Sequence, residues 1–263
     1  MTNVDNDKLN YYNRYYFSNN KPIPFKLKYN NYVIHIKPVT VEMAAFYHDN
    51  VGILLIDKNM ESSVEIISMS YLQYLIDVLF VKEEYQRTLV TILNLSFGDE
   101  YSYTMGHDEK GKVYLGIVKN NETISRITPK EFDKISDIIL NYNDPNFDNR
   151  YISEDLRKTM EDYYRLKFKN QRIPTLEEKK LCVSFKSGLT LKEINEMSYR
   201  HFDIMYNQCV SNDMFFSQKI LQASEKYKVE DLVYPLFKKK ESRFDFLQNA
   251  DNFERKVSAA AQG

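Results

Sequence analysis

The sequence contains no tryptophan, and it has only two cysteines, seven glycines and seven prolines among 263 residues. Two cysteines cannot form the disulfide framework of a small secreted domain, and Cys182 and Cys209 both lie in apolar helical contexts. We therefore expect both to be reduced core residues, and a disulfide between them is the less favoured alternative. The few glycines form no phosphate-binding loop of the dinucleotide or P-loop type.

The sequence also lacks an excess of either charge, because 36 basic residues balance 37 acidic ones and leave a net charge of −1. Such a balance creates no global field for nucleic acid or an anionic membrane, so neither is expected as a partner. No apolar run approaches the roughly 20 residues that span a bilayer, and the first residues show no apolar signal-peptide core. We expect a cytoplasmic protein.

Recognisable catalytic and metal-binding patterns are missing as well. The four histidines, His35, His48, His107 and His201, are not at a recognised ligand spacing from another histidine, a cysteine or an acid. A metal contact in the polar loop that starts at His107 is the less favoured alternative to a solvated turn. Acidic residues alternate with lysine and arginine along the predicted helices, as on a solvated surface. We expect no enzyme, no cofactor and no metal site.

The residues that are abundant can form a hydrophobic core. Hydrophobic residues make up 43% of the chain and charged residues 28%, which is typical of a folded protein. Tyrosine occurs 21 times and phenylalanine 16 times, and asparagine, lysine and isoleucine are also frequent. These residues have AT-rich codons, which points to a low-GC bacterial or viral genome.

Extended patterns alternate with helical ones in the first half. Segments 25–28 and 32–37 are predicted strands joined by a turn at Asn30-Asn31, because asparagine tolerates the positive φ of tight hairpins. Segments 101–105, 113–118 and 123–127 are predicted to form an antiparallel meander with a second such turn, Asn120-Asn121.

Several helices are predicted around these strands. Thr40 is expected to cap a helix that carries Met43, Ala44, Phe46 and Tyr47, and residues 52–56 form either the end of that helix or a short buried strand. Residues 66–95 indicate one or two core helices. Thr128-Pro-Lys-Glu has a capping threonine, a proline and an acid in the order that begins a helix.

Two domains are predicted. Residues 143–150, Asn-Asp-Pro-Asn-Phe-Asp-Asn-Arg, are rich in turn formers and have no apolar period, so they mark a linker. Residues 1–142 would form an α+β domain with a small antiparallel sheet, helices and a tyrosine-rich N-terminal arm. Residues 151–263 would form an all-α domain that ends in a frayed C-terminal tail. The predicted fold class is therefore α+β, followed by an all-α C-terminal region.

The stretch from Leu181 to Leu221 reads as three helices. Gly188 is expected to end the first, because it can adopt the left-handed conformation. Thr190 and Glu193 have the spacing of a capping box for the second, and Ser198 can cap the third. Apolar residues of the third helix fall at three-, four- and seven-residue steps and therefore share one face. They are Phe202, Met205, Cys209, Phe216 and Ile220.

This stretch is similar to a pattern in tail assembly chaperones of tailed bacteriophages, where a short helix follows a glycine turn and precedes an apolar helix. The matching positions are Cys182, Val183, Ser184, Gly188, Leu189, Thr190, Glu193, Ile194, Met197, Ser198 and Phe202. Pro24 and segments 32–38, 54–59 and 66–72 also resemble uncharacterised phage proteins of low-GC hosts. The same turn resembles a helix-turn-helix, so a DNA-binding regulator is a minor alternative, but its exposed face carries as many acids as bases.

The resemblance implies a non-enzymatic protein that binds the long tape-measure protein during tail assembly, in the cytoplasm of the infected host. A structural subunit retained in the virion, in the tail, baseplate or tail tip, is the alternative, with self-association as a homo-oligomer. The helices would bind apolar segments of the partner in a groove. The surface predicted for this contact comprises Met205, Phe215, Phe216, Phe244, Phe246 and Leu247.

Overall fold

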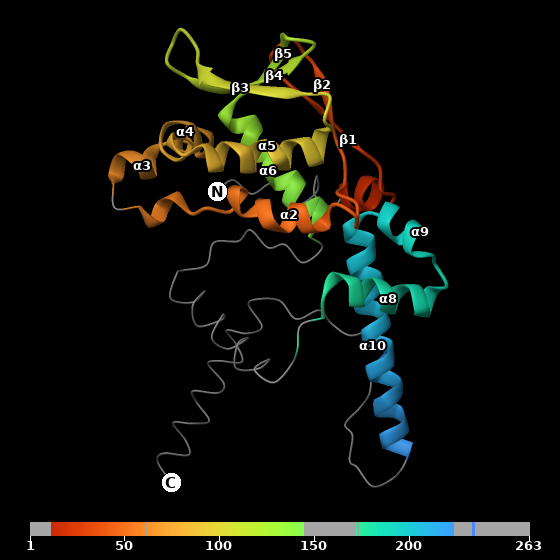
Figure 1. Ribbon diagram of the computed structural model, residues 1–263. Coiled ribbons are helices and arrows are strands. Elements are labelled where there is room, and N and C mark those ends of the chain that lie inside the picture. Colours follow the sequence, from red (N-terminus) through yellow and green to blue (C-terminus); the bar gives the residue numbers. More distant parts are fainter. Residues whose placement is uncertain (1–11, 62, 145–171, 173, 224–232, 235–263) are drawn as a thin grey trace, which may run out of the picture. The chain divides into compact units, whose positions relative to one another are not determined.

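The computed structural model describes residues 12–61, 63–144, 172, 174–223 and 233–234 (Figure 1). The contacts divide the chain into two compact units, Met1–Tyr206 and Asn207–Gly263, which are described separately below. The first residues of the arm, part of the predicted all-α domain and the C-terminal tail lie outside the described residues. The predicted boundary at 143–150 falls largely in that part of the chain and stays a prediction.

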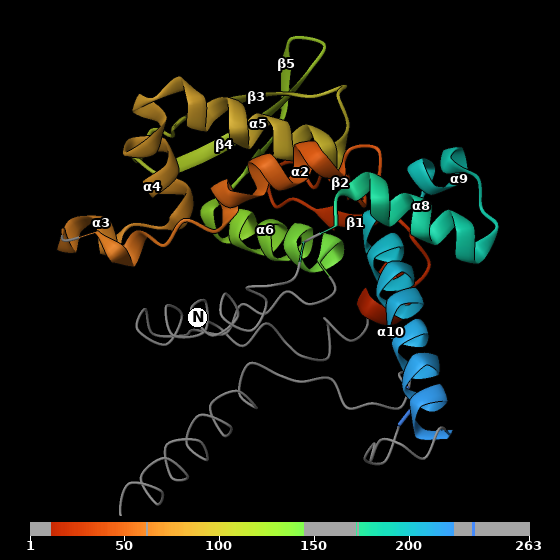
Figure 2. The same ribbon diagram turned by 60° about the horizontal axis from the view of Figure 1, so that its bottom comes forward.

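The predicted α+β class with a helical C-terminal region is confirmed (Figures 1 and 2). Two antiparallel sheets form, one in the order β1-β2 and the other in the order β3-β4-β5. The strands are β1 (Ile23–Lys26), β2 (Val33–Ile36), β3 (Ser102–His107), β4 (Val113–Lys119) and β5 (Glu122–Ile127). Both predicted hairpins and the predicted meander are therefore present.

The two asparagine pairs form the hairpin turns that the sequence predicts. Asn30 and Asn31 have φ angles of 58° and 53°, and Asn120 and Asn121 have φ angles of 52° and 65°. Two successive residues with positive φ are the backbone of a turn whose twist matches that of the flanking strands. Asparagine adopts this conformation at less cost than other side-chain-bearing residues, so these pairs set the register of both hairpins.

The described helices differ widely in length. The α-helices are α2 (Ala44–Asn50), α3 (Val64–Ser68), α4 (Tyr71–Asp77), α5 (Glu83–Phe97), α6 (Pro129–Asn143), α8 (Leu176–Ser187), α9 (Leu191–Glu196) and α10 (Tyr199–Ala223). Shorter helical turns are η1 (Asn13–Phe17), η2 (Val51–Leu54), η3 (Lys58–Met60) and η4 (Leu79–Val81). The segment 52–56, left open between helix and strand, is thus mainly the short helical turn η2.

The region predicted as one or two core helices is broken into four pieces, α3, α4, η4 and α5. The breaks have a local cause, because the hydroxyls of Ser63 and Ser70 accept hydrogen bonds from the backbone N–H groups of Ile66 and Gln73 and so start new helices. The prediction that Thr40 caps α2 is wrong. Met43 stands at the N-cap of α2 without a side-chain cap, and Thr40 instead pairs with Ser198 in an isolated bridge.

One large core joins the two sheets to the helices α4, α5 and α6. From the predicted arm, Phe17 is only 2% exposed and stacks on Tyr142 with ring centroids 4.6 Å apart. The Tyr142 hydroxyl donates to the backbone carbonyl of Lys21 at 2.7 Å. The part of the arm that the structure describes therefore packs on its own chain.

A buried carboxylate ties the first hairpin to α6. Glu131 is 4% exposed, and one of its oxygens accepts a hydrogen bond from the backbone N–H of Lys28 at 2.8 Å. Its other oxygen accepts from the backbone N–H of Thr128 at 2.9 Å and from the Thr128 hydroxyl at 2.6 Å. Buried carboxylates are tolerated where hydrogen bonds satisfy their oxygens, so this residue is both a helix cap and a link between distant segments.

Replacing Glu131 with alanine is expected to lower the free energy of unfolding by about 3 kcal/mol, because two backbone N–H groups lose a charged acceptor in a buried place. Urea denaturation followed by circular dichroism measures the change. Glu122→Ala, at an exposed position on β5, is the matched control and should cost less than about 0.5 kcal/mol. Equal losses in the two variants would contradict the linking role of Glu131.

Candidate protein-binding surface

Backbone pairing attaches the start of α10 to the α+β body. The N–H of Tyr199 donates to the carbonyl of Val39 at 2.8 Å, and the N–H of Val41 donates to the carbonyl of Met197 at 2.9 Å. The N–H of Glu42 donates to the carbonyl of Asn195 at 3.1 Å. We call the contact between segments 39–42 and 195–199 the seam.

Side chains reinforce the seam on both sides. Asn143, buried at the end of α6, accepts a hydrogen bond from the N–H of Val39 at 2.8 Å. The Arg200 guanidinium donates to the carbonyl of Asn141 at 2.8 Å and lies 5.2 Å from the ring of Phe17. Burial lowers the pKa of Arg200, and the negative charge of Asp144 opposes that shift. The guanidinium stays protonated at neutral pH, because its ordinary pKa is far higher.

An aromatic contact joins the seam to α2. The rings of His48 and Tyr199 meet edge to face, with centroids 4.8 Å apart. Partial burial lowers the pKa of His48, and the positive charge of Lys179 acts in the same direction. Burial also raises the pKa of Tyr199 to about 12. Both rings are therefore neutral at physiological pH, as expected for side chains that serve packing.

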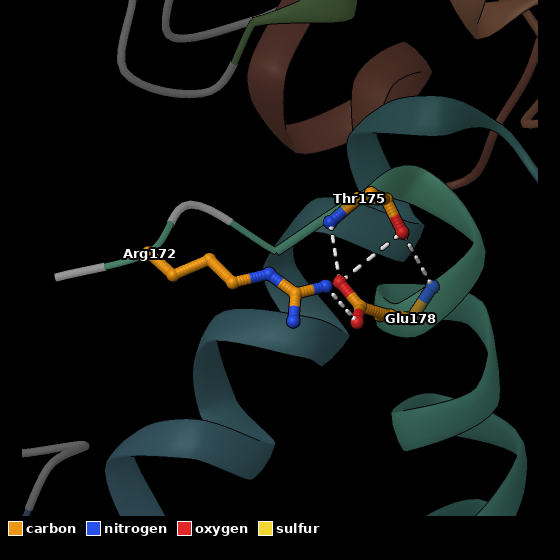
Figure 3. Close-up of polar contacts among 3 residues, drawn as sticks. All are labelled: Arg172, Thr175 and Glu178. Carbon is orange, nitrogen blue, oxygen red and sulfur yellow. Dashed lines mark hydrogen bonds and ion pairs between the residues drawn. The ribbon is translucent and has the colours of Figure 1, made fainter.

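The predicted helix end at Gly188 and the predicted helix start at Thr190 are confirmed. Thr175 and Glu178 form a capping box at the start of α8, and Arg172 pairs with the same carboxylate (Figure 3). These backbone and side-chain hydrogen bonds from Thr175 hold the pKa of Glu178 below its ordinary value. Gly188 ends α8 with a φ of 76°, in the left-handed region.

The polar groups of α9 serve the helix itself. Thr190 and Glu193 form its capping box, and Lys192 lies 4.0 Å from Glu196 one turn later. The Lys180 ammonium donates to the side chain of Asn195 at 3.2 Å. These are the residues that a recognition helix would present to DNA bases, so nothing in the geometry of α9 favours the DNA-binding alternative.

A second, small core holds α8, α9 and the first turns of α10 together. It consists of Val41, Val183, Ile194 and Phe202, each exposed by 1% or less. Val41 comes from the seam, so the helices share this core with the α+β body. Met205 and Tyr206 pack against its rim, and the Lys179 ammonium lies 5.2 Å from the centre of the Tyr206 ring.

The second part of α10, from Asn207 to Ala223, has large apolar side chains on its surface. Met214, Phe216 and Ile220 are 58%, 57% and 72% exposed, and Leu221 is 45% exposed. Phe216 and Ile220 are four residues apart and lie on one side of the helix. Met214 is two residues from Phe216 and therefore lies on nearly the opposite side, which it shares with Leu221. We call these four residues the α10 surface.

The structure brings together only part of the predicted binding surface. Phe216 is exposed, whereas Phe215 is half-buried with its ring 5.2 Å from that of Tyr234. Met205 is half-buried against the small core. Phe244, Phe246 and Leu247 lie outside the described residues, and their role stays a prediction. The two predicted core cysteines, Cys182 and Cys209, form no disulfide with each other and are half-buried.

Met214, Ile220 and Leu221 were not among the residues predicted to bind a partner. Ile220 was placed on the apolar face that begins with the buried Phe202, and the periodicity gave no sign that this face becomes exposed towards its end. Phe185 on α8, which is 87% exposed, was also missed. The sequence signal that could have predicted these exposed residues is the presence of apolar residues on two opposite sides of α10. A helix that packs through only one face usually has apolar residues on that face alone.

Across the described ranges, no three His, Cys, Asp or Glu side chains are close enough to hold a metal ion. Nor does any helix in that part of the chain combine the length and the apolar character needed to cross a bilayer.

Truncating two phenylalanines of α10 tests the difference in burial along this helix. Phe202→Ala is expected to lower the free energy of unfolding by about 3–5 kcal/mol, because Phe202 is 1% exposed and its removal leaves a cavity. Phe216→Ala is the matched control on the same helix and should cost less than about 1 kcal/mol. Urea denaturation of both variants gives the comparison. A loss for Phe216→Ala as large as for Phe202→Ala would mean that Phe216 is covered in the isolated chain.

Comparison of the chain with family models, with curated proteins and with solved structures finds no match in any of the three. The resemblance to tail assembly chaperones therefore rests on the sequence pattern between Cys182 and Phe202 and on the N-terminal segments. The physical evidence that bears on function is the chemistry of the α10 surface.

Proposed function

We propose that this chain is a non-enzymatic tail assembly protein of a bacteriophage, and that it chaperones the tape-measure protein by covering an apolar segment of it. The observation that carries the proposal is the α10 surface, with Met214, Phe216 and Ile220 each more than half exposed. The tail-assembly context comes from the sequence resemblance. The binding of a polypeptide is supported by the surface itself.

The exposed residues are costly unless a partner covers them. Complete burial of a phenylalanine, leucine, isoleucine or methionine side chain is worth about 1.5–3 kcal/mol. A helix with apolar residues on opposite sides is typically buried in a larger core or an assembly. Methionine and phenylalanine also adapt to partners of varied shape, which suits a chaperone that contacts many similar segments of one long protein.

The partner would bind as a helix against α10. Phe216 and Ile220 are one turn apart, so they match the spacing of apolar residues on an amphipathic partner helix. Tape-measure proteins, as the resemblance implies, are long and prone to aggregate before assembly. Covering their apolar positions would keep them soluble until the tail forms, with no chemical step and no cofactor.

Co-expression with the tape-measure protein of the same phage tests the proposal. The wild-type chain is expected to raise the soluble fraction of the tape-measure protein and to co-purify with it. The double variant Phe216→Asp, Ile220→Asp should reduce the co-purified amount by tenfold or more, because a loss of about 1.4 kcal/mol already corresponds to a factor of ten.

The matched control is Ser217→Asp, which adds a carboxylate between these two positions on an exposed site of the same helix. It should leave co-purification unchanged, and circular dichroism should show equal helix content in all variants. The proposal is wrong if the wild-type chain neither solubilises nor retains the tape-measure protein. Mass spectrometry of purified particles separates the two tail roles, since a chaperone is scarce there and a structural subunit is present at fixed copy number.

A further inference from the structure

As far as the described residues show, the outer edge of β3 lacks the lysine, proline and bulge that usually protect the edge of a sheet. Within the described residues β3 pairs only with β4, so alternate backbone N–H and C=O groups of Ser102–His107 point away from the sheet. Exposed edges are commonly blocked by lysine, proline or a bulge. The sequence of β3 has no lysine or proline, and its register with β4 runs from Ser102 to His107 without a shift.

The opposite edge of the same sheet is protected. The register between β4 and β5 shifts at Ile117/Val118, as at a bulge, and β5 carries a charged residue at Arg126. The first hairpin also bonds to this edge. The Asn30 amide donates to the carbonyl of Ile124 at 3.4 Å, and the Ser125 hydroxyl donates to the carbonyl of Tyr29 at 2.9 Å. The two edges therefore differ in a way that singles out β3.

A cleft of about 510 Å³ lies beside β3, between the strand and α5. Val90, Tyr103 and Met105 supply apolar lining, and Glu83 and Arg87 are bridged to each other at 2.7 Å. The hydroxyl of Tyr103 is buried and has no hydrogen-bond partner in the described part of the chain. Burial raises the pKa of Tyr103, so it remains a neutral hydroxyl.

We propose that β3 pairs antiparallel with β3 of a second copy of this chain, so that the three strands of each copy form one continuous sheet. The dimer would cover the unprotected edge and the cleft beside it. This interface is separate from the α10 surface and goes beyond the proposed chaperone function.

The charges at the ends of β3 select the register. Residues directly opposite in an antiparallel pair point to the same face, so the two-fold axis must pass through a residue near the middle, Thr104 or Met105. An axis at Thr104 places Glu100 across from Asp108 of the second copy, which is repulsive. Hydrogen bonds from the backbone of Lys112 and Lys110 lower the pKa of Asp108, so this carboxyl is ionised.

An axis at Met105 brings Glu100 towards the turn that carries Lys110 of the second copy. These two side chains have opposite charges and attract, and the two-fold symmetry forms the same contact a second time. Glu100 and Lys110 are both exposed. This register also sets Met105 opposite Met105 on the face that borders the clefts, and flexible methionine side chains fill irregular space of this kind. Charge complementarity therefore favours a second copy paired about Met105.

The oligomeric state of the full chain tests the proposal. Light scattering coupled to size-exclusion chromatography, over a range of concentrations, is expected to show a reversible dimer. Thr104→Lys should weaken dimerisation by tenfold or more, because an exposed lysine on an edge strand opposes pairing. The matched control is Thr123→Lys, at an exposed position on the protected strand β5, which should leave the dimer intact.

A charge exchange tests the register without altering β3 itself. Lys110→Glu should weaken the dimer, and the double variant Glu100→Lys, Lys110→Glu should restore it. A wild-type chain that stays monomeric at every concentration, or a dimer that Thr104→Lys leaves unchanged, would overturn the proposal. The double variant Phe216→Asp, Ile220→Asp should still dimerise, so failure of the chaperone function and failure of this interface are distinguishable.

Discussion

Backbone pairing between segments 39–42 and 195–199 determines how α8, α9 and the start of α10 pack on the α+β body. The seam is short, yet it fixes the position of Ser198 and therefore the residue at which α10 begins. It also carries Val41 into the small core of Val183, Ile194 and Phe202. The backbone hydrogen bonds and the buried apolar contacts occur at the same place. Rotation of α8 and α9 about the seam would therefore break the hydrogen bonds and expose the small core.

Local patterns in the sequence were sufficient to predict the hairpin turns and several helix ends. Asparagine pairs predicted both hairpins because the backbone of such turns needs positive φ at two residues, and Gly188 predicted the end of α8 for the same reason. The capping boxes at Thr128 and Thr190 depend only on residues three positions apart. Each of these features is decided within one turn of the chain, so a single sequence contains the information.

Features decided by distant residues were not predictable. Thr40 has the residue type of a helix cap, but its backbone pairs with Ser198, and no local pattern reports that partner. The exposure of Ile220 was not predicted, because this residue continues the apolar periodicity that begins with the buried Phe202. The protection of only one edge of the three-stranded sheet depends on where the first hairpin packs, which is again a contact between distant segments.

The link between Lys28 and Glu131 has a consequence for how the chain is made. The two residues are 103 positions apart, and Lys21 and Tyr142 are 121 apart. At a synthesis rate of about 5–20 residues per second, the ribosome needs about 5–20 seconds to deliver α6 after the first hairpin has emerged. Throughout that interval the backbone N–H of Lys28 lacks its carboxylate acceptor and the carbonyl of Lys21 lacks its tyrosine donor, so the large core cannot be completed until α6 has emerged.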